Sequence, residues 1–255
     1  MKSKLLFLVF IAAILGCNNS QAPVNEPPIS EPPPPPIANT LTEAEQTEGW
    51  ELLFDGQSTE KWRGYNKEGF PTQGWGVKDG EIQVFHSGNE EAGFGGDIIT
   101  RDSFTDFILK VDFVLSDTSN SGIFYLIKEV PETPIWHNAP EYQLLDDETY
   151  RAMGGVTDAQ MTGANYDMHP QKVNHSRPIG EWNTARIEKR GKDVKHFLNG
   201  ELVIEYTLHD ADWEARYQAS KFKDYPGYAR EEMAPIGLQD HGHLVRFRNL
   251  KIKRL

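Results

Sequence analysis

Short segments in which apolar and polar residues alternate recur along this chain, and they constrain its fold more than any other feature. In residues 107–115 every second side chain is apolar, as in a strand with one buried face. Turn dipeptides such as Asp79-Gly80 and Asn199-Gly200 separate several segments and favour short hairpins. The pattern predicts an all-β fold, a two-sheet antiparallel β-sandwich or jelly roll, with one short helix at residues 210–221. Strands are expected at residues 49–54, 75–77, 81–85, 97–100, 107–115, 121–127, 141–145, 182–190, 193–198, 202–207, 236–240 and 245–253.

Residues 1–16 have the composition of a bacterial signal peptide. Lys2 and Lys4 precede an apolar run of eleven residues, 5–15, which is too short to cross a bilayer comfortably. The run ends in Ile-Leu-Gly-Cys, which resembles the lipoprotein cleavage box, and Cys17 is the only cysteine of the chain. An ordinary signal peptide with a chance cysteine is the alternative. We therefore expect an exported protein that is lipid-anchored through Cys17 to the cell envelope, at the outer membrane facing the periplasm.

Residues 17–46 are rich in proline and poor in large apolar side chains, which is typical of an extended stalk. A proline-motif ligand for a partner is the alternative. The composition changes near Trp50, so we expect one domain at residues 47–255. The net charge of −12 makes nucleic acid and anionic lipid unsuitable partners. The sequence has no dinucleotide fingerprint, P-loop, C-x-x-C or H-E-x-x-H, so nucleotide cofactors and common zinc sites lack support.

A strand at residues 141–145 supplies the leading candidates for a functional site. Alternation puts Glu141 and Gln143 on one face, a carboxylate beside an amide. Gln239 and His241 share a strand face in the same way, so all four residues can line one concave surface. The alternatives are an edge strand with solvated polar groups and a histidine that closes a turn.

Further candidates are less specific. His196 shares a strand face with apolar residues, so it is either a core histidine or a site residue. Asn120 enters a strand from a loop, where its amide either orients a ligand or caps the turn. Residues 149–180 show little periodicity, which indicates a functional loop near the site. Aromatic rings stack on sugars, and Trp136, Tyr166 and Trp182 are candidates for this role, with burial in the core as the alternative.

An acidic run, Asp146-Asp147-Glu148, follows the strand that carries Glu141. Carboxylate oxygens suit a calcium or another divalent metal ion, and Glu141 and Asp146 are the candidate ligands. The spacing follows no established metal-binding loop, and acidic runs of this kind are commonly solvated turns. No cofactor is certain from the sequence, and a divalent metal ion stays open.

Short segments throughout the chain after residue 48 carry a family resemblance. They are Gly49–Gly56, Trp75–Ile82, Asn120–Ile123, Glu141–Asp147, Gly180–Asn183, His196–Gly200, Ser220–Phe222, Leu238–Gly242 and the run from Phe247. In this order they closely resemble the 3-keto-disaccharide hydrolase family, which implies a concanavalin-like jelly-roll fold and action on glycosides oxidised at C3. Tyr166-Asp167 resembles the Tyr-Asp pair of that family. Leu126 stands where many relatives have an arginine, which indicates a subgroup difference in substrate binding.

The resemblance implies a chemistry that these residues can perform. A keto group at C3 acidifies the C2 proton, so a base can remove it and the enolate can expel the C1 substituent before water adds. Glu141 is the leading base, or a metal ligand, and His241 is the second catalytic candidate. The expected sugar-binding residues are Asn120, Gln143, Tyr166, Asp167, His196 and Gln239. Direct net hydrolysis stays open, as does a lipid-anchored carbohydrate-binding protein without catalysis, whereas Gln143 disfavours a two-carboxylate glycosidase.

Overall fold

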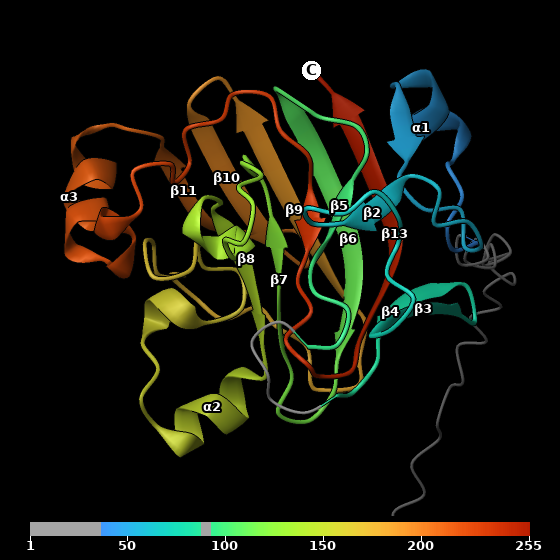
Figure 1. Cartoon of the computed structure of the whole chain (residues 1–255), viewed down its shortest axis with the longest axis horizontal. Coiled ribbons are helices and arrows are strands. Elements are labelled where there is room, and N and C mark those ends of the chain that lie inside the picture. Colours follow the sequence, from blue (N-terminus) through green and yellow to red (C-terminus); the bar gives the residue numbers. More distant parts are fainter. Residues whose placement is uncertain (1–36, 88–92) are drawn as a thin grey trace, which may run out of the picture. The chain divides into compact units, whose positions relative to one another are not determined.

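Two antiparallel sheets enclose the hydrophobic core in this computed structural model, which describes residues 37–87 and 93–255. Figure 1 shows the two sheets stacked face to face. The eight-stranded sheet has the order β11 (Glu201–Thr207), β10 (Asp193–Leu198), β9 (Asn183–Arg190), β6 (Phe107–Leu115), β13 (Val245–Arg254), β4 (Glu81–Val84) and β3 (Trp75–Lys78), and β1 (Trp50–Leu52) also pairs with β13. The five-stranded sheet has the order β2 (Trp62–Gly64), β5 (Ile98–Thr100), β12 (Gly237–Leu238), β7 (Asn120–Phe124) and β8 (Glu141–Leu145). The predicted two-sheet sandwich is confirmed.

Strand β6 shows why the alternation in the sequence leads to this fold. Its residues Phe107, Leu109, Val111 and Phe113 are buried, while the residues between them are half-buried on the opposite face. The buried side chains pack against the five-stranded sheet in one continuous core. Burial of apolar area of this kind, at roughly 25 cal/mol per Å2, is the main contribution that stabilises a sandwich.

Several strands differ from the prediction, and β1 and β7 are shorter than the strands expected at 49–54 and 121–127. Strand β2 was not expected, because three residues are too few to show a period of two. The expected strand at 236–240 contains only two residues with regular pairing, although the amide of Gln239 still donates to the carbonyl of Gly122 at 3.0 Å. The chain therefore continues beside β7 as far as Gln239.

The predicted helix is confirmed as α3 (Ala211–Ala219), whose N-cap Asp210 accepts a hydrogen bond from the amide of Trp213 at 2.7 Å. The expectation of a single helix is wrong, because α1 (Glu43–Thr47) and α2 (Asp147–Met153) also form. In Figure 1, α2 and α3 lie on the side of the sandwich where β8 and β11 end the two sheets. Three short 3-10 helices, η1 (Ile135–His137), η2 (Asp158–Gln160) and η3 (Lys221–Asp224), complete the helical elements of the described chain.

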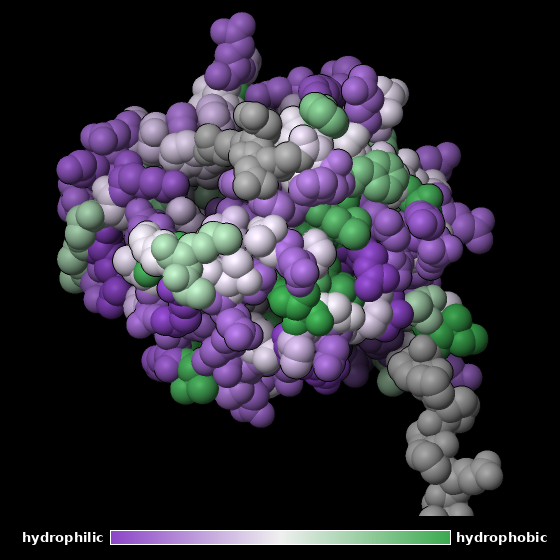
Figure 2. Space-filling view, turned by 90° about the horizontal axis from the view of Figure 1, so that it is seen from below, coloured by the Kyte–Doolittle hydropathy of each residue, from purple (hydrophilic) through white to green (hydrophobic). Residues whose placement is uncertain are grey.

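The surface seen in Figure 2 is mostly hydrophilic, with small and separate hydrophobic patches. Within residues 37–87 and 93–255, no helix is both long and apolar enough to cross a membrane. The expected signal peptide at 1–16, the lipid site at Cys17 and most of the expected stalk at 17–46 lie outside the described residues.

Residues 39–46, which were predicted to belong to the stalk, contact the sandwich. The amide of Asn39 donates to Asn249 Oδ1 at 2.6 Å, and the amide of Asn249 donates to Asn39 Oδ1 at 2.8 Å. The side chain of Asn39 also donates to the carbonyl of Gly80 at 2.7 Å. Further along, Lys251 on β13 forms an ion pair of 2.8 Å with Glu45 of α1. The chain therefore packs against the domain before residue 47.

These contacts predict that a protein beginning at residue 47 folds but is less stable than one beginning at residue 37. Loss of the Asn39 hydrogen bonds and of the Glu45 ion pair should lower the free energy of unfolding by about 1–3 kcal/mol. Urea denaturation of the two proteins measures the difference. Asn39→Ala in the longer protein should reproduce part of the loss, and equal stability of the two proteins would contradict the role assigned to residues 37–46.

Candidate functional site

Three neighbouring strands of the five-stranded sheet bring the candidate residues together. In the register of β7 with β8, Gly122 lies opposite Gln143 and Phe124 opposite Glu141. Residues directly opposite each other in an antiparallel pair point to the same face, so Gly122, Glu141 and Gln143 share one face. Gln239 follows β12 on the other side of Gly122. The intervening residues, such as Tyr142, belong to the core, so the candidate face points away from the eight-stranded sheet.

This face carries a small pocket with a volume of about 50 Å3. Its lining residues are Asn120, Trp136, Glu141, Gln143, Tyr166, Lys221, Gln239 and His241. Six of these eight residues were site candidates from the sequence, and Trp136 was a candidate for stacking on a sugar. Lys221 was not among the predicted site residues. Residues separated by more than a hundred positions therefore meet at one site.

The side chain of Glu141 lies across Gly122 on the neighbouring strand. A Cβ atom at Gly122 would be 2.0 Å from Oε1 of Glu141 and 2.6 Å from its Cγ, far inside van der Waals contact. Only glycine can stand at this position while Glu141 keeps its conformation. Gly122 has no side chain, so it leaves the space in which the carboxylate of Glu141 lies. Glu141 is buried, with 5% of its surface exposed.

Gln143 fixes the orientation of that carboxylate. With its amide nitrogen turned towards Glu141, Gln143 donates to Oε1 at 3.0 Å and to the carbonyl of Ser121 at 3.3 Å. Asn120 lies at hydrogen-bond distance on the other side, 3.2 Å from the Gln143 amide. A buried carboxylate needs such donors because it has lost its water, and the arrangement leaves a chain of amides along the pocket wall.

The long connection after β8 forms an additional edge of the sheet. The amide of Gly163 donates to the carbonyl of Gln143 at 2.9 Å, the amide of Gln143 to Ala164 at 3.1 Å, and the amide of Tyr166 to Glu141 at 3.0 Å. Residues 163–166 therefore run along β8 and cover its free edge. This pairing brings Tyr166 to the pocket, where Gln160 donates to its hydroxyl at 3.3 Å.

Lys221 supplies a cation to the pocket at the first residue of η3, directly after α3. Its Nζ lies 4.1 Å from the centre of the Trp136 ring and 4.6 Å from the centre of the Tyr166 ring, over both faces. The segment Ser220–Phe222 carried a family resemblance, but its position after a helix gave no signal that it faces β8. The contact between Lys221 and Trp136 depends on tertiary structure alone.

Three polar atoms of the pocket residues have no hydrogen-bond partner among the described residues. They are Nε1 of Trp136, Oε1 of Gln239 and Nδ1 of His241, and all three are buried. Buried polar atoms are nearly always paired in folded proteins, so unpaired atoms that line one pocket indicate a place for a polar ligand. They offer both donors and acceptors, which suits hydroxyl groups.

Three predicted residues lie elsewhere. His196 is fully buried, with Nδ1 donating to the carbonyl of Gly163 at 3.0 Å and Nε2 accepting from the hydroxyl of Tyr125 at 2.9 Å, so it lies in the core and does not line the pocket. Asp167 follows Tyr166 but does not line the pocket. Trp182 lies beneath Arg248, whose guanidinium carbon is 3.8 Å from the ring centre, and not in the pocket. The alternation of apolar and polar residues predicted which face of a strand each side chain occupies, but not which other segments cover that face.

The acidic run after β8 has structural roles. Asp146 is the N-cap of α2, accepting from Thr149 at 3.2 Å, and it also accepts from the amide of Thr118 at 2.9 Å. Asp147 accepts from the amide of Thr162 at 2.9 Å, and burial raises the pKa of Asp147 despite these hydrogen bonds. Within the described ranges, no group of three or more His, Cys, Asp or Glu side chains has the geometry of a metal site. The carboxylate of Asp146 is therefore better explained as a cap than as a metal ligand.

Comparison with known proteins places the chain in a family. The model of the 3-keto-alpha-glucoside-1,2-lyase-like domain matches residues 49–253. A 3-keto-disaccharide hydrolase of Bacteroides thetaiotaomicron is 37% identical over 230 residues, which are 82% of this chain and 79% of that protein. The sandwich with a polar pocket on one sheet face is thus the domain of a glycoside-cleaving enzyme. The chain belongs to the family of 3-keto-alpha-glucoside-1,2-lyase-like domains, as the sequence motifs predicted.

Solved structures share the fold. A protein of Parabacteroides distasonis, described as a candidate glycosyl hydrolase, is 34% identical and superimposes with a TM-score of 0.77, covering 86% of this chain and 100% of that chain. A second protein of the same organism and description is 25% identical, with a TM-score of 0.62, covering 81% of this chain and 99% of that chain.

The buried histidines predict a loss of stability in acid. Burial lowers the pKa of His196 to about 3 and that of His169 to about 4, from an ordinary value of 6.5. At a pH between the lowered pKa of each histidine and 6.5, the unfolded chain binds more protons than the folded chain. The free energy of unfolding should therefore fall as the pH drops below 6.5, by about 1.4 kcal/mol per pH unit for each histidine. Denaturation at pH 4–7 measures this slope. His196→Gln should make it shallower, and an unchanged slope would contradict the prediction.

Proposed function

We propose that this chain cleaves glycosides whose sugar ring carries a keto group at C3, with Glu141 as the base that removes the C2 proton. Membership of the family and the 37% identical hydrolase support a glycoside-cleaving enzyme that acts on 3-keto sugars. The observation that carries the assignment of Glu141 is the convergence of one buried carboxylate, one lysine cation and several amides in a single pocket.

The proposed reaction is an elimination followed by hydration. Glu141 takes the C2 proton, and the electrons of the C2–H bond form an enolate whose negative charge lies on the C3 oxygen. When the C3 carbonyl re-forms, a double bond forms between C1 and C2, the bond from C1 to the leaving oxygen breaks, and that oxygen takes a proton. Water then adds across C1 and C2, with the hydroxyl on C1 and the proton on C2, so the net change is hydrolysis.

The remaining pocket residues have roles that follow from their chemistry. Lys221 is the cation of the pocket, and a positive charge near the C3 oxygen stabilises the enolate as it forms. His241 is suited to give the leaving oxygen its proton, and Gln143, Asn120 and Gln239 to bind ring hydroxyls. Tyr166 and Trp136 offer aromatic faces to the ring.

The composition of the pocket argues against an ordinary glycosidase. Such enzymes use two carboxylates on opposite sides of the glycosidic bond, at separations of roughly 5–9.5 Å. Among the described residues that line the pocket, Glu141 is the only acid. A single base is what proton abstraction beside a ketone requires.

The location of the enzyme is a separate proposal. The composition of residues 1–17 supports export and attachment of lipid to Cys17, and the proline-rich residues that follow support a spacer between the membrane and the domain. In that position the enzyme would meet sugars in the cell envelope.

Glu141→Gln should lower kcat for a 3-keto-glucoside by about 100-fold or more, because the amide keeps the volume and the contact with Gln143 but cannot accept the proton. Exchange of the C2 proton into deuterated solvent should be lost together with cleavage, and circular dichroism should show an intact fold. Glu148→Gln, an exposed acid of the same stretch of chain, is the control and should be fully active.

Near-normal turnover by Glu141→Gln would contradict the assignment and favour His241 as the base. Binding of the sugar by a wild-type protein that cleaves neither the 3-keto-glucoside nor its unoxidised parent would instead support a carbohydrate-binding protein.

Lys221→Met should lower kcat by about 10–100-fold with little change in KM, since the charge acts on the enolate and not on the bound ground state. Methionine keeps an apolar chain over the rings of Trp136 and Tyr166, so the pocket should keep its shape. Lys221→Arg should recover part of the activity, and Lys223→Met, two residues further on and exposed, should have no effect. A change confined to KM would indicate that Lys221 only binds substrate.

A further inference from the structure

A second pocket adjoins the first and shares two residues with it. Its volume is about 220 Å3, and its lining residues are Tyr65, Lys67, Gly96, Asp97, Pro134, Ile135, Trp136 and Gln239. Trp136 and Gln239 line both pockets. We propose that the second pocket binds the leaving group attached at C1, with the glycosidic bond lying across the wall formed by Trp136 and Gln239. This proposal rests on the proposed function, in which the first pocket holds the 3-keto ring.

The shared wall has the polar atoms that such a bridging ligand needs. Nε1 of Trp136 is a donor and Oε1 of Gln239 is an acceptor, and neither has a partner among the described residues. Gln239 is 6% exposed, so its oxygen has little access to bulk water. A glycoside that spans both pockets can accept from the indole and donate a hydroxyl to the amide oxygen, which pairs both atoms at the same place.

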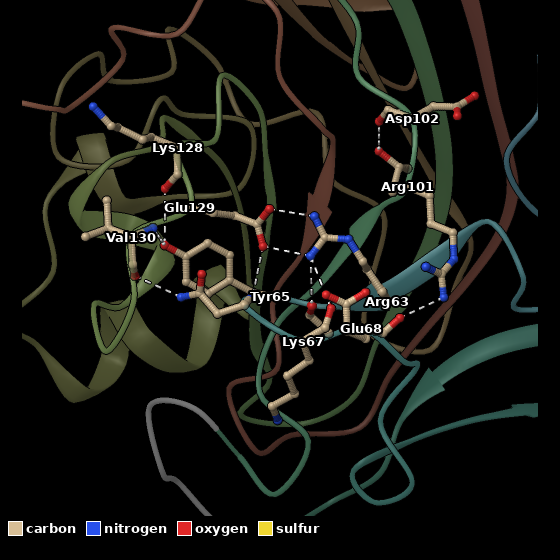
Figure 3. A network of polar contacts seen from close by, with 12 residues as sticks. Arg63, Tyr65, Lys67, Glu68, Arg101, Asp102, Lys128, Glu129 and Val130 are labelled. Carbon is tan, nitrogen blue, oxygen red and sulfur yellow. Dashed lines mark hydrogen bonds and ion pairs between the residues drawn. The ribbon is translucent and has the colours of Figure 1, made fainter.

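One side of the second pocket is held by a network of polar contacts (Figure 3). Arg63 on β2 binds Glu129 through two nitrogens, with Nη1 2.7 Å from Oε1. The amide of Asn66 donates to the same carboxylate at 2.9 Å, and its side chain donates to the carbonyl of Val130 at 2.8 Å. Because the pair is bidentate and involves backbone groups on both sides, it joins residues 63–66 to residues 129–130 more firmly than a single exposed ion pair would.

Tyr65 lies within this network, and its hydroxyl has partners on the facing segment. The hydroxyl donates to the carbonyl of Lys128 at 3.2 Å and accepts from the amide of Val130 at 3.2 Å. Its ring packs against a small hydrophobic cluster on the outer face of the sheet, which includes Phe124 and Ile135. The ring is therefore fixed in position at the wall of the pocket, as a stacking platform must be.

The opposite side of the second pocket is connected to the segment after β12 that carries Gln239 and His241. The amide of Tyr65 donates to the carbonyl of Asp97 at 2.8 Å, and the amide of Asp240 donates to Asp97 Oδ1 at 3.0 Å. Asp240 in turn accepts from the amide of Gly95 at 3.0 Å. Hydrogen bonds therefore connect the walls of the two pockets, so one ligand can extend across both.

The lining indicates the chemical class of the leaving group. Tyr65, Pro134 and Trp136 present largely apolar surface, which matches the apolar face of a six-membered ring. A lining of this kind suits a ring at this position, either a pyranose or an aryl group.

The test compares Tyr65→Ala with the wild-type enzyme on three 3-keto-glucosides that differ only in the leaving group: methanol, phenol and glucose. Methanol is too small to reach Tyr65. We expect kcat/KM to fall at least about 10-fold for the phenyl and glucosyl substrates and to stay within about twofold for the methyl substrate. A loss confined to one of the two ring-bearing substrates identifies that ring as the natural occupant.

Two variants serve as controls. Tyr150→Ala removes another half-buried tyrosine, which lies on α2 and lines neither pocket, and it should not distinguish the three substrates. If Tyr65→Ala does not fold, Tyr65→Leu keeps apolar volume against the cluster while removing the flat ring, and it should show the same dependence on the leaving group.

Equal losses of kcat/KM by Tyr65→Ala on all three substrates, or no loss on any of them, would overturn the leaving-group site. Cleavage of the methyl substrate by the wild-type enzyme would still uphold the proposed function. A wild-type enzyme that cleaves none of the three substrates would overturn both.

Discussion

The register in which β7 pairs with β8 and β12 is the constraint on which the site depends. Because side chains alternate across a sheet, this register sends Ile123, Tyr142 and Leu238 into the core and the polar residues between them to the outer face. A slip of one residue in β8 would turn Glu141 and Gln143 towards the hydrophobic core and Tyr142 towards the outer face. The hydrophobic core therefore enforces the arrangement of the polar site, and stability and function depend on the same backbone hydrogen bonds.

Within that register, the carboxylate of Glu141 is held by space and by hydrogen bonding together. Gly122 leaves room for it, Gln143 donates to it, and the edge formed by residues 163–166 closes the far side of its strand. A buried carboxylate costs several kcal/mol in lost hydration unless it is paired, so the amides around it are a condition of its position. An acid held in this way needs little reorganisation before it accepts a proton, which is an advantage for a base.

Much of this arrangement could be predicted from the sequence, and the failures have physical causes. Alternation in short strands identified the sandwich and put Glu141, Gln143, Gln239 and His241 on one surface, because a period of two is a local property. The role of His196 was not predictable, since a core position and a site position share that period, and only the packing of Tyr125 and Gly163 around the ring decides between them. Lys221 was missed because its approach to Trp136 is purely tertiary. The acidic run was interpreted as a turn or metal site, although an Asp followed by further acids is also a signal for the start of a helix.

The position of β13 has a consequence for how the chain acquires its fold. This strand, Val245–Arg254, is the last of the described strands in the sequence, yet it lies between β6 and β4 and also pairs with β1. When the ribosome has produced β1, β4 and β6, the strand that joins them has not yet been made, so the eight-stranded sheet can close only after residue 254 is available. Contacts between such distant parts of a chain form slowly, so we expect the eight-stranded sheet to be among the last parts of the fold to form.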